Sequence, residues 1–546
     1  METEEIAHAL KLTAQLMELH NENPFKVKSL SNAAFKLDKT DISLEGKSVT
    51  ELESIEGIGK SIANKIIELQ QTGTLKELKA LVEQTPAGVI EMLGIKGIGP
   101  KKVSQLWKEL GTESPGELLY ACNENRLVEL KGFGAKTQEA VRKAIEFNMA
   151  SKGLFHYASL EKSALKLVDE VKKKLKTDLV SLTGAMRRKA IIVDKMEILV
   201  SANTDFDMQA FEMPAGVKPE WIFCKPETFT EKLFETTGSP AHLQELGEWK
   251  KMAAGAKTEQ AIYESLGMQY IEPELREGRG EVALARAHNL PRLIEMGDLK
   301  GILHNHSNWS DGLHTLKQMA DYCRELGYEY LGMCDHSQSA FYANGLKADR
   351  VLEQQKEIDL LNVQMAPFHV FKGIESDILY DGSLDYPEEI LKSFDFVVAS
   401  VHSILKMDEE KATSRLISAI ENPYTTILGH PTGRLLLSRE GYPVDHKKVI
   451  DACAASGVII ELNAHPYRLD IDWTWISYCL EKGVRISINP DAHEMQGYHD
   501  MYFGVCAARK GMLTKEMCFN ALSLEEIKNY FSSKKARAAS GMTFSK

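Results

Sequence analysis

The sequence predicts a multidomain protein with an all-α N-terminal region, a mixed α/β middle and a C-terminal α/β barrel. Its 546 residues are too many for one hydrophobic core and indicate two to four domains. Residues 1–150 place apolar side chains at helical spacing, as at Ile62, Ile66 and Leu69, with short glycine turns between the helices. From residue 299 onward, short apolar runs alternate with helical segments, which is typical of a parallel β/α fold.

Composition narrows the class of protein. Hydrophobic residues make up 43% and charged residues 26% of the chain, an ordinary globular balance. No apolar stretch of about 18 residues occurs, so we expect no membrane span, and the N-terminus does not predict a secretory signal. Eight scattered cysteines without a C-x-x-C pair argue against a zinc ribbon or a disulfide framework and favour a cytoplasmic protein. The net charge of −12 does not by itself indicate nucleic-acid binding, although 171–176 and 187–189 are basic.

A short pattern occurs three times in the helical region, at 52–66, 93–107 and 127–141. Each copy has an apolar approach, a Gly-apolar-Gly turn and a polar or basic residue that opens a helix. Glycine lets the backbone turn tightly and approach a ligand, and the following helix N-terminus attracts phosphate. The copies resemble the helix-hairpin-helix motif, which binds the DNA backbone without reading sequence, and a purely structural hairpin is the alternative. The candidate DNA-binding residues are Gly57, Gly59, Lys60, Gly97, Gly99, Lys101, Lys102, Gly132, Gly134 and Lys136.

Metal-capable side chains follow the predicted strands of the C-terminal half. His304 and His306 follow one apolar run, and Asp311 can reach back from the next turn. The ends of later runs carry His336, Glu375, His402, His430, Asp491 and His493. The carboxyl ends of barrel strands converge on one face, where imidazole and carboxylate together suit Zn²⁺, Mn²⁺ or Fe²⁺. Nine ligands exceed the needs of one ion, so we expect two or three, a cluster that suits phosphoester cleavage. The alternative is nine independent core or surface groups.

In chain order, these nine residues match the ligand pattern of the polymerase-and-histidinol-phosphatase (PHP) domain, and residues 299–535 resemble that domain. The resemblance implies a distorted (β/α)7 barrel with a trinuclear metal site, often of manganese or zinc. It also implies that Arg434 holds a phosphate and that Asn463 lines the site.

The whole chain resembles bacterial family X DNA polymerases. The resemblance implies a lyase-like domain at 1–75, fingers at 76–150, a palm at 151–225 and a thumb at 226–285. A linker at 286–298, the PHP domain and a basic tail at 536–546, expected to be disordered, complete the chain. Lys65 matches the family's Schiff-base lysine, and a solvated surface charge is the alternative.

The palm departs from the family pattern. Gly184, Arg187 and Arg188 are kept, but Ala185 replaces a serine. The Asp-x-Asp positions fall on Lys195 and Glu197, and the third aspartate falls near Glu220. A charged lysine cannot ligate a metal and would repel one, so we doubt that Mg²⁺ or Mn²⁺ binds here and that this palm polymerises. Asp205 and Asp207 have the right spacing but lie further along the chain.

The sequence therefore predicts a family X polymerase-like, DNA-binding enzyme with a metal-dependent PHP phosphoesterase. The expected reaction is 3′–5′ exonuclease cleavage in DNA repair, by a monomer acting on gapped, nicked or primer–template DNA. One alternative is a gap-filling polymerase that uses dNTPs and has lyase activity. Others are a non-catalytic DNA-binding scaffold and a small-molecule phosphatase.

Overall fold

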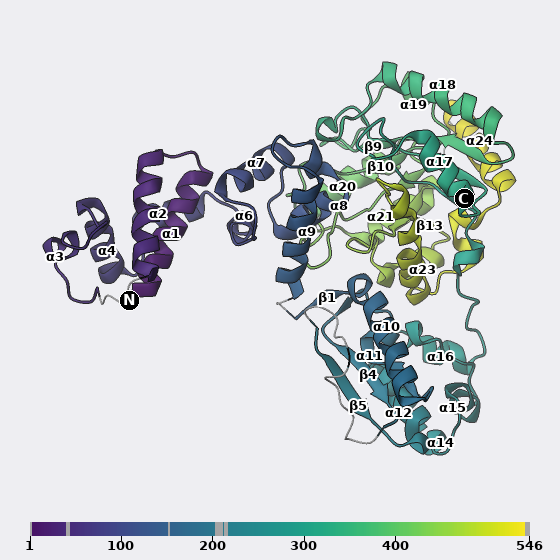
Figure 1. The fold of residues 1–546 in the computed structure, drawn as a ribbon. Coiled ribbons are helices and arrows are strands. Elements are labelled where there is room, and N and C mark those ends of the chain that lie inside the picture. Colours follow the sequence, from purple (N-terminus) through teal and green to yellow (C-terminus); the bar gives the residue numbers. More distant parts are fainter. Residues whose placement is uncertain (1–2, 40–43, 151–152, 203–210, 212–216, 541–546) are drawn as a thin grey trace. The chain divides into compact units, whose positions relative to one another are not determined.

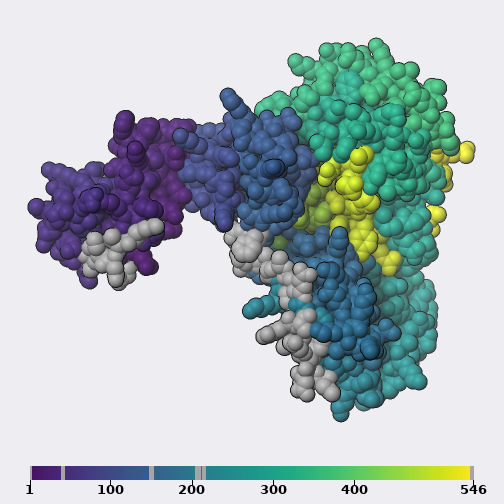
Figure 2. All heavy atoms as spheres, in the orientation of Figure 1, coloured from purple at the N-terminus to yellow at the C-terminus, as the bar shows by residue number. Residues whose placement is uncertain are grey.

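The computed structural model divides the chain into two compact units, Met1–Asn148 and Met149–Lys546. It describes residues 3–39, 44–150, 153–202, 211 and 217–540, and Figures 1 and 2 draw the others in grey. Asp205 and Asp207 lie outside the described residues. Every helix in the described ranges is too short or too polar to pass through a lipid bilayer.

Unit 1 is helical throughout its described part. Apolar residues at helical spacing, such as Leu10, Met17 and Leu37, are buried where α1 packs on α2. The expected all-α N-terminal region is therefore confirmed. Its helices are α1 (Thr3–Leu19), α2 (Pro24–Lys39), α3 (Val49–Glu53), α4 (Lys60–Thr72), α5 (Lys76–Glu83), α6 (Ala87–Met92), α7 (Pro100–Leu110), α8 (Pro115–Asn123), η1 (Arg126–Glu129) and α9 (Ala135–Ala150).

Unit 2 opens with a palm-like α/β region. Strands β2 (Val180–Leu182), β4 (Met196–Val200) and β5 (Pro219–Phe223) form a sheet in the order β2-β4-β5. Strands β4 and β5 run parallel, and their register sets Glu197 opposite Glu220. The two strands expected within 180–201 are therefore present. The remaining elements here are β1 (Phe155–His156), α10 (Tyr157–Leu175), α11 (Gly184–Arg187) and β3 (Ile192–Val193).

A small helical region follows, in the place of the thumb. Its core includes the fully buried Arg276, whose guanidinium donates to Glu259, and Arg187 of the palm-like region pairs with the same carboxylate. The expected linker is packed, because Leu293 and Ile294 are buried. The elements are η3 (Pro226–Thr228), α12 (Phe229–Thr237), α13 (Pro240–Leu246), α14 (Trp249–Ala253), α15 (Glu259–Ser265), η4 (Pro273–Leu275), α16 (Glu281–Arg286) and η5 (Met296–Asp298).

The rest of unit 2 is a barrel of parallel strands. One sheet runs β6-β7-β8 and the other β13-β12-β11-β10-β9, and β8 and β9 are separated only by Gly373 and Ile374. A parallel bridge between Asn305 and Ala492 joins the first strand to the last. If β8 and β9 are counted as one interrupted strand, the described residues form seven parallel strands, and the expected distorted (β/α)7 barrel is confirmed. Its strands are β6 (Gly301–Ile302), β7 (Tyr330–Met333), β8 (His369–Lys372), β9 (Glu375–Asp377), β10 (Val398–Ser400), β11 (Ile427–Leu428), β12 (Ile459–Asn463) and β13 (Ile486–Asn489).

Helices surround these strands, and the last one closes the barrel at the amino ends of the strands (Figure 1). Phe531 of α24 stacks on Phe396 and meets Phe371 edge-on, both at 5.0 Å between ring centres. The expected disorder of the tail is wrong for residues 536–540, which continue this helix. The helices are α17 (Leu316–Glu325), η6 (Phe341–Ala343), α18 (Ala348–Met365), α19 (Glu388–Leu391), α20 (Glu409–Ile420), α21 (His446–Ser456), η7 (Trp473–Trp475), α22 (Ile476–Glu481), η8 (Met495–Asp500), α23 (Met501–Lys510), η9 (Lys515–Met517), η10 (Phe519–Ala521) and α24 (Leu524–Ser540).

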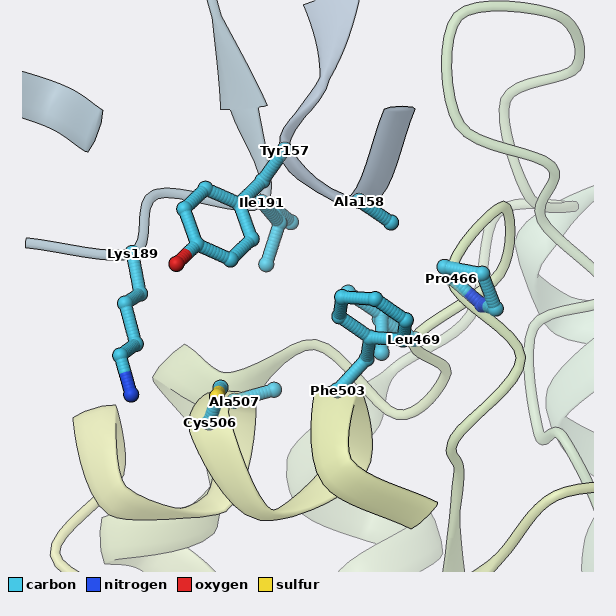
Figure 3. A pocket seen from close by; sticks show the side chains of 9 residues that line it. All are labelled: Tyr157, Ala158, Lys189, Ile191, Pro466, Leu469, Phe503, Cys506 and Ala507. Atoms are coloured by element: carbon cyan, nitrogen blue, oxygen red, sulfur yellow. The ribbon is translucent and has the colours of Figure 1, made fainter. Parts of the chain in front are cut away.

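Within unit 2, a seam of contacts joins the palm-like region to the barrel. Figure 3 shows Tyr157 and Ile191 on one side, facing Leu469 and Phe503 on the other. The buried ammonium of Lys510 donates to the carbonyl of Arg188 at 3.0 Å, which adds a polar anchor to this apolar seam.

Candidate metal centre

The carboxyl ends of the barrel strands bring all nine predicted metal ligands together. The apolar residues of the strands fill the core of the barrel, and the polar residues lie at the edge of the barrel where the carboxyl ends of the strands meet. We call the set the barrel centre: His304, His306 and Asp311 after β6, His336 after β7, Glu375 at the start of β9, His402 after β10, His430 after β11, and Asp491 and His493 after β13.

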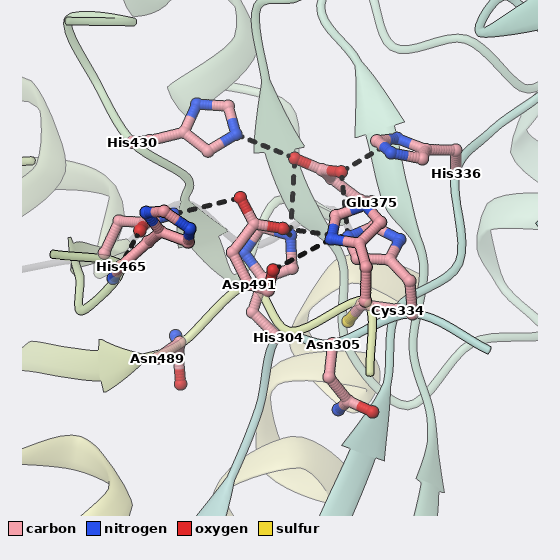
Figure 4. A network of polar contacts seen from close by, with 12 residues as sticks. His304, Asn305, Cys334, His336, Glu375, His430, His465, Asn489 and Asp491 are labelled. Carbon is pink, nitrogen blue, oxygen red and sulfur yellow. Dashed lines mark hydrogen bonds and ion pairs between the residues drawn. The ribbon is translucent and has the colours of Figure 1, made fainter. Parts of the chain in front are cut away.

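Glu375 lies in the middle of the barrel centre (Figure 4). Its Oε1 is 3.0 Å from His430 Nε2 and 3.1 Å from His402 Nε2. Its Oε2 is 2.9 Å from His336 Nδ1, while His304 Nε2 lies 3.3 Å from Oε1. One fully buried carboxylate thus contacts four imidazoles from four different strands.

His306 belongs to two sets of candidate ligands, one that includes Asp491 and one that includes Asp311. Its Nε2 is 2.9 Å from Asp491 Oδ1, and His304 Nε2 is 3.4 Å from the same oxygen. On the other side, Asp311 lies 3.4 Å from His493 Nε2 and 3.6 Å from His336 Nε2. These arrangements give three sets of ligand atoms that could each hold an ion: His306, Asp311, His336 and His493; His304, His306, Glu375 and Asp491; and His336, Glu375 and His402.

The residues present fit divalent ions. Zinc bonds of about 2.0–2.2 Å to nitrogen and oxygen put tetrahedral neighbours about 3.3–3.6 Å apart, and several separations above fall in this range. Both ring nitrogens of His336 and Nε2 of His304 are buried, and each lies 2.9–3.6 Å from a carboxylate oxygen. Imidazole nitrogens and carboxylate oxygens that converge in this way are the ligand atoms that a divalent ion takes.

The buried carboxylates of the barrel centre also favour binding of cations. Burial opposes ionisation of Glu375, but His402, His304 and His336 outweigh it and hold the pKa of that carboxyl well below its usual range. Burial disfavours a charged His304, yet Glu461, Asp491 and Glu375 raise the pKa of that imidazole well above its usual value. Burial, with repulsion from His493 and His336, lowers the pKa of His306 to about 3. Divalent ions bound at the barrel centre would balance the charge of these carboxylates.

The loop between His306 and Asp311 is held by a carboxylate that precedes another ligand. Asp335 accepts hydrogen bonds from the backbone N–H of Ser307 at 2.8 Å and from the Ser310 hydroxyl at 2.6 Å. The residue next to His336 therefore fixes the shape of the loop that carries three other candidate ligands.

Sequence reasoning missed the carboxylates that orient two histidines. Glu461 Oε2 is 2.7 Å from His304 Nδ1, and Asp377 Oδ1 is 2.5 Å from His402 Nδ1. In both cases the other ring nitrogen faces Glu375, the arrangement by which outer carboxylates set the tautomer of a ligand. A signal existed for Glu461, because a carboxylate inside the apolar run of β12 is rarely buried without a partner.

The two predicted site-lining residues have different surroundings. Asn463 donates to Asp491 Oδ2 at 3.1 Å, so it lies at the barrel centre. Arg434 instead binds the loop that follows β12, through Asp472 at 2.5 Å and the carbonyl of Arg468 at 3.0 Å. The guanidinium that reaches the barrel centre is Arg468, which lies 3.0 Å from Asp491 Oδ2 and was not predicted.

The palm-like region holds a second acidic cluster, and we call Lys195, Glu197 and Glu220 the palm site. The ammonium of Lys195 lies 2.8 Å from Glu197 and 3.1 Å from Glu220. The hydrogen bonds that this ammonium donates to both carboxylates raise the pKa of Lys195. The Glu197 carboxylate rests on Gly184, where an added Cβ would meet it at 1.8 Å. Arg187 and Arg188 are bound to Glu259 and Glu277 rather than to this cluster.

The three glycine turns of unit 1 share one backbone geometry. The first glycine of each pair has a positive φ, of 90° at Gly57, 99° at Gly97 and 90° at Gly132, which a residue with a side chain rarely adopts. The second glycine precedes or caps the next helix: Gly59 for α4, Gly99 for α7 and Gly134 for α9.

The apolar residue between the glycines anchors each turn, since Ile58, Ile98 and Phe133 are buried. Lys60, Lys101 and Lys136 are exposed beside the turns. Lys102 instead lies over the ring of Phe133 at 5.0 Å, so it packs one hairpin against the next.

Lys65 is engaged by a carboxylate. Its ammonium pairs with Glu77 and is partly buried on α4. The ammonium of Lys65 therefore already has an acidic partner, on the neighbouring helix α5.

Comparison with protein families first defines the class. Residues 1–75 match the helix-hairpin-helix domain, 89–146 the SAM-like helix-hairpin-helix tandem and 303–465 the PHP domain. The barrel and its centre are thus those of a PHP-type, metal-dependent hydrolase that also carries helix-hairpin-helix domains.

The full chain defines the family more closely. It is 33% identical over 574 aligned positions to the DNA polymerase/3′–5′ exonuclease PolX of Bacillus subtilis, covering 97% of this chain and 99% of the relative. The chain therefore belongs to the bacterial family X DNA polymerases of the PolX type.

Two more distant similarities cover the barrel. A protein of Thermoanaerobacter named "probable phosphatase" is 27% identical over 258 positions, which is 44% of this chain and 98% of that one. A crystal structure of histidinol phosphate phosphatase from Lactococcus lactis is 15% identical, with a TM-score of 0.31, and covers 39% of this chain and 94% of its own.

Proposed function

We propose that this protein is a metal-dependent 3′–5′ exonuclease that removes nucleotides from DNA ends, with its chemistry in the barrel centre. The observation that carries the proposal is the convergence of nine metal-capable side chains at the carboxyl ends of the strands, seven of them buried and two half-buried, with Glu375 in their middle. The name of the Bacillus subtilis relative, which covers the full chain, supports the polarity of cleavage.

The residues of the barrel centre would hold two to three divalent ions, manganese or zinc by their ligand types. Such ions supply Lewis acidity for a phosphodiester and for the water that attacks it. The chain's own residues do the positioning: Glu461 and Asp377 fix His304 and His402 with one ring nitrogen toward Glu375. Arg468 balances the outer oxygen of Asp491, which leaves its inner oxygen beside His306.

We propose that unit 1 holds the DNA. Three turns with the same φ pattern present glycine backbone and the exposed lysines Lys60, Lys101 and Lys136. Backbone contacts of this kind carry no base specificity and weaken steeply with salt. The substrate would therefore be a DNA end of any sequence, in gapped, nicked or primer–template form.

For the palm site we propose that it does not catalyse nucleotide addition. The observation is the Lys195 ammonium held between Glu197 and Glu220, where the family pattern has metal-binding aspartates. By the same reasoning, the ion pair between Lys65 and Glu77 argues against lyase chemistry.

The test is a labelled primer annealed to a longer template and incubated with Mn²⁺, with and without dNTPs. We expect the primer to shorten from its 3′ end, and His304→Ala to abolish shortening while DNA affinity remains. The matched control is His8→Ala, an exposed histidine of unit 1, which should cleave like the wild type.

Each alternative has its own signature in this assay. Primer extension with dNTPs that survives His304→Ala would establish a working palm. Release of phosphate from phosphomonoesters without DNA cleavage would identify a small-molecule phosphatase. DNA binding without cleavage in the presence of any divalent metal would identify a non-catalytic DNA-binding scaffold.

A further inference from the structure

An aromatic ring is held out into solvent next to the barrel centre. Phe341, in the short helix η6, is 85% exposed, among the most exposed of the large apolar side chains in the described residues. Its neighbour Tyr342 packs between it and the centre, with ring centres 5.8 Å from Phe341 and 6.4 Å from the ligand His336. A single ring thus separates the exposed phenylalanine from a predicted metal ligand.

The loop that carries Phe341 is firmly tied down. It leaves the barrel with a hydrogen bond from Ser337 N–H to the Glu375 carbonyl at 3.0 Å and returns with one from Leu346 N–H to the His336 carbonyl at 2.8 Å. In between, Ser339 donates through its N–H and its hydroxyl to Asp385, at 2.6 and 2.5 Å.

The far side of the loop is equally constrained. Gly345 packs so closely on Ser337 that a Cβ would lie 1.9 Å from the carbonyl oxygen, and Arg350 donates to the Asn344 carbonyl at 3.0 Å. The exposure of Phe341 is therefore a fixed feature and does not come from a loose loop. A large ring fixed in water forgoes the stabilisation that burial would give, and here it is fixed beside the barrel centre, where a ligand could cover it.

We propose that Phe341 is a stacking platform for the nucleobase at the 3′ end of the DNA strand being degraded. The inference rests on the proposed exonuclease function. A phosphodiester at the barrel centre has its terminal nucleoside attached directly to it, so the base must lie close to the ligands. Every base has a flat face that stacks on an aromatic ring whatever its sequence, which suits an enzyme that removes nucleotides of any kind.

The test compares two primer oligonucleotides, each annealed to a longer template, that differ only at the 3′ end, one with a thymine and one with an abasic tetrahydrofuran residue. With Mn²⁺, we expect the wild type to cleave the thymine end with a kcat/KM about 5- to 100-fold higher, the range that stacking on one base supports. Phe341→Ala should bring the two substrates to equal rates by slowing only the thymine end. Phe341→Tyr, which keeps the ring, should retain the preference.

Val363→Ala is the control, because Val363 is 82% exposed on α18 and lies on no loop of the barrel centre. It should behave like the wild type, and metal content by mass spectrometry should be unchanged in all variants. A wild type that cleaves both ends equally, or a Phe341→Ala protein that slows both ends equally, would overturn the platform but leave the exonuclease standing. A wild type that cleaves neither oligonucleotide would overturn the exonuclease itself.

Discussion

The barrel centre and the palm site solve the same electrostatic problem with different cations. The palm site gathers carboxylates from two neighbouring parallel strands, and the barrel centre gathers them from strands around the barrel. Carboxylates this close repel each other unless a positive charge lies between them. In the palm site the chain supplies that charge itself, through Lys195 between Glu197 and Glu220. In the barrel centre it supplies imidazoles, which are cationic only when protonated and can otherwise ligate a metal.

The difference supports the proposal that this chain keeps two acidic sites and uses one of them for catalysis. A lysine ammonium is a fixed counter-ion that satisfies the carboxylates and competes with any metal for them. Histidines crowded around Glu375 cannot all stay charged, since burial and mutual repulsion lower the pKa of His306 to about 3. We therefore propose that the barrel centre accepts a cation and that the palm site excludes one.

The strongest way to break this comparison is to remove one carboxylate from each site. Glu375→Gln keeps the shape of the side chain but takes away the charge that four histidines contact. We expect loss of bound metal and a fall of at least about 100-fold in exonuclease rate, because the ligand common to two of the ion-binding sets is gone. Glu197→Gln, the matched change in the palm site, should leave metal content and exonuclease rate unchanged. Equal losses in the two variants would refute the division of labour.

A smaller effect is expected from Glu461, a carboxylate that supports two predicted ligands, His304 and His430, without being a predicted ligand itself. Glu461→Gln loses the charge that orients His304. Removing such a partner typically weakens metal affinity about 10- to 100-fold, so a metal titration should shift while activity returns at high Mn²⁺. Activity that stays absent at saturating metal would show that Glu461 does more than orient.

Reversing the central charge of the palm site would test the comparison more sharply. Lys195→Asp places a third carboxylate beside Glu197 and Glu220 and removes the built-in cation. We expect new Mn²⁺ binding, by about one ion per chain, measured by paramagnetic resonance in a protein whose barrel carries Glu375→Gln. Lys195→Met, which removes the charge without adding a ligand, is the control and should bind none. Mn²⁺ binding that is equal in the two variants would show that Lys195 does not govern access.

The smallest effect concerns neither acidic site. Lys101 is exposed at the start of α7 and is proposed to contact a phosphate. Lys101→Ala should reduce the slope of log affinity against log salt by about one, with metal content of the chain unchanged. Gln105→Ala, an uncharged and half-buried position on the same helix, should leave the slope as it is. A slope that does not respond to Lys101 would remove this hairpin from the DNA-binding surface.

The fold could be predicted because its signals are local. Strand-ending polar residues follow apolar runs, and a parallel barrel has only one edge at which those ends can meet. That rule alone brought His304 and Asp491 together across the closure of the barrel, although they are far apart in sequence.

What could not be predicted depends on tertiary paths and on long side chains. Arg434 and Arg468 are both arginines in polar loops, and only the course of the loop after β12 decides that Arg468 reaches Asp491. The register of β4 and β5 sets Glu220 opposite Glu197, but that Lys195 spans both depends on the rotamers of a flexible chain. The helical end of α24 was missed because its anchor, Phe531, packs on strands far back in the sequence.

The closure of the barrel has a consequence for how the protein is made. A ribosome delivers the chain from the N-terminus, and domains fold in that order, at about 5–20 residues per second. Unit 1 ends at residue 148, so the 398 residues that follow (546 minus 148) take roughly 20–80 s to synthesise. During that interval the segment after β6 lacks its partner after β13, and the amino ends of the strands are not yet covered by α24. The hairpins proposed to bind DNA can therefore fold well before the barrel centre is assembled. We expect a nascent chain to bind DNA earlier than it can hydrolyse a phosphodiester.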